Sequence, residues 1–259
     1  MREIELAVAE TASPTAEENV LRHHIAMAYR LIGHFDLTTL TDGFVSARAS
    51  NAEREIILGR YGALPALVRA SDLHRRNLDS ALQIEKADGV DVDAMCFSRM
   101  VYDTCPEFNA VIHAHPKYGM IFSSMDCELD CISQYSLMFK GLVGYIDWHS
   151  ADVSGDAMRK QIVGALEAGK RVIVLRNHGF LIPGRTVAEA VWTLIRMEET
   201  AMVQIEAMKT GAPLKKIPDD IASDSMKQYW DEPYIDNDGT REWSEFERML
   251  DRMDPSYRD

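Results

Sequence analysis

Two histidines separated by one residue follow a short apolar run in VIHAHP, residues 111–116. On a β-strand, side chains at positions i and i+2 leave the same face, so His113 and His115 would project together. Neutral imidazole is a common protein ligand for divalent metals, and two imidazole nitrogens on one face can bind one ion. A third ligand must come from elsewhere, and RVIVLRNHG offers His178 at the end of a second apolar run. Since the ends of strands are where α/β sheets usually carry their chemistry, this pattern predicts a metal site.

The elements that must position these histidines alternate between helical and extended patterns. Helical spacing of apolar residues predicts helices over residues 17–35, 93–105, 117–125, 156–169, 186–211 and 241–253, with Thr186 as a cap of the longest. Alternating or continuous apolar runs predict strands within residues 41–50, 54–62, 109–116 and 171–179. We therefore expect a single α/β domain over residues 17–211. An N-terminal arm over 1–16 would precede it, and a C-terminal extension over 212–259 would pack on the domain or on a neighbouring subunit.

Composition excludes several classes of partner. The 259 residues carry a formal net charge of −13, which disfavours nucleic-acid and anionic membrane surfaces. No apolar run reaches the roughly 20 residues of a membrane span, and the acidic N-terminus lacks the features of a signal peptide. Four cysteines without a paired spacing indicate reduced thiols. We expect a cytoplasmic protein that acts on a small molecule, with no nucleic-acid or membrane partner.

The stretches LTDGFVSARAS, RASDL, PEFNAVIHAHPKYG and VLRNHGFLIPGRTVAEAVW resemble the class II aldolase/adducin family, and the C-terminal tail is similar to that of its bacterial adducin-like members. The resemblance implies a three-layer α/β/α sandwich around a largely antiparallel central sheet. It implies a homotetramer with sites at subunit interfaces. It also implies one divalent metal ion per subunit, Zn, Mn or Fe, held by His113, His115 and His178.

The chain departs from the sugar-phosphate aldolases of that family at the residues that handle phosphate and protons. Those enzymes carry a Ser-Ser-Glu triplet whose Glu precedes the first metal-binding histidine by nineteen residues; here the triplet is Val92, Asp93 and Ala94. Their phosphate-binding Gly-Asn turn is replaced by Gly43 and Phe44. Phosphate recognition needs hydrogen-bond donors and positive charge, so we expect a substrate that is not phosphorylated.

The three predicted metal ligands still support the reaction of a metal-dependent carbon–carbon lyase, by retro-aldol cleavage or decarboxylation. The loss of polar groups around Phe44 favours an aromatic hydroxy or carboxy substrate and a role in aromatic compound catabolism. Asp93 and Tyr135 are the predicted proton-transfer residues. Arg48 and Arg176, with Phe44, are the predicted substrate-binding residues, and His149 in DWHS is a further residue that would join the site.

Two alternatives come from other functional classes. Three histidines can also hold Fe(II), so the same fold would support a non-heme Fe(II) oxygenase. A non-catalytic scaffold of the adducin type would explain the missing glutamate. It would not explain why all three histidines are retained.

Overall fold

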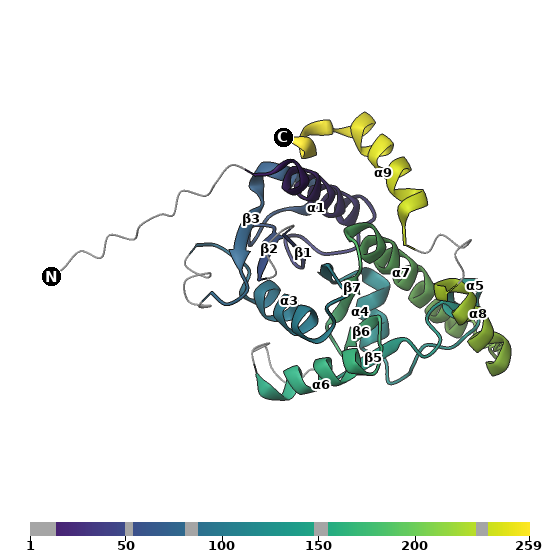
Figure 1. Ribbon diagram of the computed structural model, residues 1–259. Coiled ribbons are helices and arrows are strands. Elements are labelled where there is room, and N and C mark those ends of the chain that lie inside the picture. Colours follow the sequence, from purple (N-terminus) through teal and green to yellow (C-terminus); the bar gives the residue numbers. More distant parts are fainter. Residues whose placement is uncertain (1–13, 50–53, 81–87, 148–154, 232–237) are drawn as a thin grey trace.

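The computed structural model describes residues 14–49, 54–80, 88–147, 155–231 and 238–259, so His149 lies outside the described residues. Its centre is a seven-stranded sheet in the order β3-β2-β1-β4-β7-β6-β5 (Figure 1). Every neighbouring pair is antiparallel except β5 and β6, which run parallel. The strands are β1 Phe44–Arg48, β2 Glu55–Leu58, β3 His74–Asn77, β4 Ala110–Ala114, β5 Val143–Ile146, β6 Val172–Leu175 and β7 Gly179–Gly184.

Helices cover both faces of the sheet and produce the three-layer α/β/α sandwich that the family resemblance implied. On one face lie α1 (Ala16–His34) and α7 (Val187–Lys209), and on the other lie α3 (Val92–Thr104) and α6 (Asp156–Glu167). Alternate residues of each central strand enter opposite cores: Ile112 packs with α1 and α7, whereas Val111 packs with α3 and α6. The strands β4, β6 and β7 are buried on both faces, and β6 accordingly reads as a continuous apolar run, VIVL.

The two long helices begin where the sequence supplies hydrogen-bond acceptors. The Thr15 hydroxyl accepts a hydrogen bond from the Glu18 N–H at the start of α1. Thr186 does the same for the Glu189 N–H of α7, as the sequence predicted. Each side chain satisfies one of the first N–H groups of its helix, which have no partner within the helix.

Shorter helices and the C-terminal segment complete the structure. They are α4 (Lys117–Ser123), α5 (Gln134–Leu137), α8 (Asp219–Asp231) and α9 (Thr240–Met253), with single turns of 3-10 helix at Pro65–Leu67, Ala70–Asp72 and Pro255–Arg258. The buried guanidinium of Arg30 in α1 donates to Asp254 and Ser256, at 2.9 Å each. Tyr257 has no exposed surface. The end of the chain is thus packed against α1. Among the described helices, none is long and apolar enough to cross a membrane.

Gly59 and Gly164 offer a matched pair of substitutions. A Cβ at Gly59, just after β2, would lie 2.3 Å from the Tyr29 hydroxyl oxygen, inside the core that α1 forms with the sheet. A Cβ at Gly164, on the exposed side of α6, would meet nothing within 4 Å. We expect Gly59→Ala to lower the free energy of unfolding by about 1–3 kcal/mol through overpacking. We expect Gly164→Ala to raise it by about 0.5–1 kcal/mol because alanine is the better helix residue. Urea unfolding measures both, and equal effects of the two substitutions would contradict this account of the sheet packing.

Candidate metal centre

Strand β4 and the connection between β6 and β7 bring the three histidines to one end of the sheet. His113 lies in β4 opposite Leu181 of β7, and His115 follows the end of β4. Leu175 pairs with Gly179, so residues 176–178 form a tight connection that carries His178. Asn177 adopts a left-handed backbone conformation there (φ 60°), which asparagine tolerates better than most residues. Gly179 allows close approach, since a Cβ there would lie 2.5 Å from the carbonyl oxygen of Ala114.

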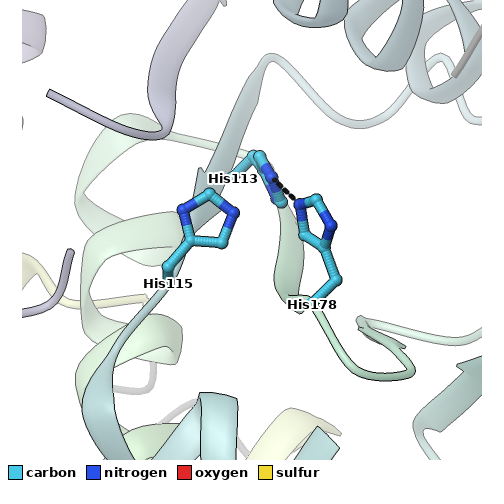
Figure 2. A group of neighbouring side chains, drawn as sticks. All are labelled: His113, His115 and His178. Atoms are coloured by element: carbon cyan, nitrogen blue, oxygen red, sulfur yellow. Dashed lines mark hydrogen bonds between the residues drawn. The ribbon is translucent and has the colours of Figure 1, made fainter. Parts of the chain in front are cut away.

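The imidazoles converge on one point (Figure 2). One nitrogen from each of the three rings lies within 4.8 Å of the other two. The Nε2 atoms of His113 and His178 are 3.0 Å apart. Zinc binds histidine nitrogens at about 2.0–2.1 Å, so two ligands of one ion lie at most about 4.2 Å apart. The 3.0 Å pair meets this limit, and the full cluster meets it after an adjustment of a few tenths of an ångström. Sequence reasoning predicted this meeting of His113, His115 and His178.

Two details of hydrogen bonding fit a bound cation. His113 Nδ1 lies 2.9 Å from the carbonyl oxygen of Phe180, an acceptor only, so Nδ1 carries the hydrogen and Nε2 presents a lone pair to the cluster. His115 Nδ1 is buried and has no hydrogen-bond partner within the described part of the chain, while Nε2 of the same ring faces the other two histidines. A fixed tautomer with the free nitrogen directed at a shared point is the usual arrangement of metal-binding histidine. The residues present therefore fit a divalent metal ion.

Burial keeps the three rings neutral. Loss of solvent around His113 lowers its pKa well below the ordinary 6.5, and the two neighbouring imidazoles lower it further. Burial also lowers the pKa of His115, with the charge of Asp42 acting in the opposite direction. The pKa of His178 is lowered to about 4, mainly by burial and then by His115. Neutral imidazole is the form that binds metal, so near pH 7 the site holds the lone pairs that a cation needs.

Aromatic packing and a helix cap fix the positions of the ligands. The ring centroids of Phe44 and Phe97 lie 5.9 Å and 5.3 Å from that of His113, in the core beneath α3. Helix α4 follows His115 directly. The partly buried carboxylate of Glu198, in α7, accepts the first N–H groups of α4, those of Tyr118 and Gly119, at 2.7 Å each. The ligands are held by the core on one side and by a capped helix on the other.

The sequence predicted a role in the site for four further residues besides Phe44. Asp93 is exposed near the start of α3, one helical turn before Phe97, so it lies on the side of α3 that packs toward His113. Tyr135 lies in α5, where the guanidinium carbon of Arg196 sits 4.3 Å from its ring centroid.

The two arginines make hydrogen bonds to the backbone. Arg48 lies at the other end of β1 from Phe44, and its guanidinium donates to the carbonyl oxygens of Tyr102 and Phe108. Arg176 is two residues before His178 and donates to the carbonyl oxygens of Met125 and Cys127. The structure therefore brings Phe44 to the cluster, while Asp93 lies one helical turn from Phe97, which packs against His113. Arg48 is not brought there, and Arg176 holds the chain beside it.

Sequence reasoning missed Asp42. Strand β1 pairs with β4 so that Phe44 lies opposite His113, and Asp42 precedes this last pair by two residues, where its charge acts on the His115 imidazole. The only sequence signal was an acidic residue two positions before Phe44, and its meaning depends on a strand register that spacing alone does not supply.

Comparisons with known proteins place these features in context. The family model described as "Class II Aldolase and Adducin N-terminal domain" matches residues 23–205. Human gamma-adducin is 30% identical over 206 residues, which cover 79% of this chain and 29% of that protein, so the chain spans under a third of the adducin.

Two solved structures show the same fold over nearly the whole chain. An aldolase II superfamily protein from Pseudomonas syringae has a TM-score of 0.85 at 26% identity, covering 95% of this chain and 98% of that one. The L-fuculose 1-phosphate aldolase from Glaciozyma antarctica PI12 has a TM-score of 0.78 at 23% identity, covering 96% and 97%.

The lowered pKa values predict an unusual pH dependence of metal affinity. Protons compete with a metal for imidazole only below the imidazole pKa, and here those values lie below 6.5. We therefore expect the Kd for Co²⁺ to change by no more than about threefold between pH 8 and pH 6, followed by a steep loss of affinity under more acidic conditions. Titration of the metal-free protein, followed by visible absorption, measures this. A tenfold weakening for each pH unit below pH 7 would contradict the description of the rings as buried and neutral.

Proposed function

Because the chain belongs to the class II aldolase and adducin family, we propose that it is a divalent-metal-dependent lyase that breaks a carbon–carbon bond. The observation that carries the proposal is the convergence of three neutral imidazoles on one point, with the His113 tautomer fixed by the Phe180 carbonyl. Without a cation, the three neighbouring imidazoles have no evident role in the stability of the fold. As metal ligands, the same three side chains have a direct function.

The reaction type follows from the donor set. When bound, a divalent ion held by three neutral ligands retains its positive charge and stabilises the negative charge that develops on a substrate oxygen as the bond breaks. Retro-aldol cleavage and decarboxylation both need this stabilisation. The protein's own contribution is to hold His113 rigidly between Phe97, Phe44 and the Phe180 carbonyl. The ligand positions are then set before any substrate arrives.

The start of α3 supports a substrate without a phosphate group. A helix N-terminus often binds phosphate through its free N–H groups. Here the Asp91 carboxylate accepts the N–H groups of Asp93 and Ala94, at 2.9 Å and 3.2 Å. Asp91 and Asp93 also place two carboxyl groups at this position, and an exposed carboxylate such as that of Asp93 would repel a phosphate dianion. Phe44 supplies no hydrogen-bond donor from its side chain.

We propose an aromatic hydroxy or carboxy compound as the substrate. The support is the replacement of the family's phosphate-binding Gly-Asn turn by Gly43 and Phe44, which removes a polar side chain. Phe44 and Phe97 are themselves 2% and 0% exposed and pack behind His113. Asp93 is the proposed proton-transfer group on the side of α3, with Tyr135 as a second. The homotetramer with sites between subunits is likewise proposed, on the resemblance to the family.

A non-catalytic scaffold is the second candidate. It is favoured by the 30% identity to gamma-adducin and by Ala94, a fully buried methyl group at the position of the glutamate in the sugar-phosphate aldolases. Metal binding separates the two candidates, because a scaffold has no requirement for a filled cluster.

The lyase proposal predicts activity that depends on the third ligand. Purified protein loaded with Zn²⁺, Mn²⁺ or Fe²⁺ is incubated with hydroxylated aromatic acids and aryl-substituted hydroxy compounds, and release of CO₂ or an aldehyde is measured. We expect His178→Ala to reduce kcat/KM at least about 100-fold because the metal loses a ligand.

The control is His34→Ala, a histidine at the end of α1, which should leave activity within about twofold of wild type. Wild-type protein that binds metal but releases neither product from the whole set would contradict the lyase proposal. Turnover that strictly requires O₂ and Fe²⁺ would favour the oxygenase.

A further inference from the structure

Asp42 lies at the end of the sheet that carries the second histidine of the cluster. Phe44 pairs with His113 as the last pair of the antiparallel β1–β4 ladder, and Asp42 precedes Phe44 by two residues. Gly43 lets the chain pass close to β4: its φ is +85°, and a Cβ there would lie 2.5 Å from the His113 carbonyl oxygen and 3.4 Å from the Cα of Ala114. The segment that carries Asp42 therefore runs beside the end of β4, next to His115.

Hydrogen bonds hold the backbone of Asp42 in place, and its side-chain carboxylate can accept a further hydrogen bond. Its N–H donates to the Thr39 carbonyl oxygen at 3.0 Å, and its carbonyl oxygen accepts from the Thr38 hydroxyl at 2.7 Å. The side chain is exposed, and its carboxylate makes no hydrogen bond or ion pair with any other residue that the structure describes. Its negative charge nevertheless acts on His115, where it opposes the effect of burial on the imidazole pKa.

His115 has a ring nitrogen that can donate a hydrogen bond to such a carboxylate. Its Nε2 faces the cluster and its Nδ1 is the buried nitrogen without a hydrogen-bond partner among the described residues. A metal-bound histidine usually donates its second N–H to a carboxylate or carbonyl, which fixes the ring and strengthens it as a ligand. His113 has such a partner in the Phe180 carbonyl.

We propose that Asp42 is a positioning residue of the metal site, whose carboxylate accepts the Nδ1–H of His115 when the site is filled. This inference rests on the metal site of the proposed function and is independent of the reaction catalysed there. Asp42 lies outside the cluster of ligand atoms, which among the described residues contains the three histidines alone. It acts through His115.

The test measures metal affinity. Co²⁺ is titrated into metal-free protein against a competing chelator, with visible absorption as the readout. We expect Asp42→Asn to weaken Co²⁺ binding about 10–100-fold, the range for loss of such a partner, and Asp42→Glu to restore part of the loss. Asp36→Asn removes the same charge from the preceding loop, where asparagine suits the left-handed backbone (φ 51°), and should change the Kd by less than about twofold.

A double-mutant cycle identifies the route of the effect. In a His115→Ala background, Asp42→Asn should change the Kd by less than about twofold, because the group through which Asp42 acts is gone. A full effect in that background would overturn the proposal, as would wild-type affinity in the single variant or a protein that binds no Co²⁺. Tight metal binding by wild-type protein without turnover would count against the lyase reaction and leave the role of Asp42 standing.

Discussion

The cluster of His113, His115 and His178 depends on one electrostatic constraint. Its three imidazole rings are held together, largely out of water, and the cluster contains no carboxylate. Protonating any one ring would place a positive charge in a poorly solvated position, so all three remain neutral. Because His113 carries its hydrogen on Nδ1, its Nε2 accepts a hydrogen bond from the Nε2–H of the neutral His178 ring, 3.0 Å away. The β4–β7 register and the tight connection before Gly179 hold the rings in this position.

The same constraint explains the apolar surroundings. Phe44 and Phe97 exclude water from one side of His113 and leave no room there for polar groups. At the start of α3, Asp91 already occupies the N–H groups that would otherwise attract an anion. Rigidity around the first ligand and poor recognition of phosphate therefore have a common structural origin.

Local sequence patterns predicted much of this structure. The HxH spacing identified two ligands because side chains alternate on a strand, and the capped helices α1 and α7 followed from helical periodicity. Strand β7 was missed because Gly179, Pro183 and Gly184 resemble a turn, yet it pairs with both β4 and β6 in the centre of the sheet. Strand β5 and helices α5 and α8 were missed as well. The roles of Arg48 and Asp42 could not be predicted, since each depends on which residue of a distant segment lies opposite.

The contact between Arg30 and residues 254–256 has a consequence for how the first helix completes its surroundings. The guanidinium of Arg30 is buried beside the carbonyl oxygens of Ala66 and Val68. The carboxylate that balances its charge belongs to Asp254, more than two hundred positions later. The charge of this arginine is therefore compensated only after segments far apart in the sequence have come together. Among the described residues, those close to α1 in the sequence do not supply that counter-charge.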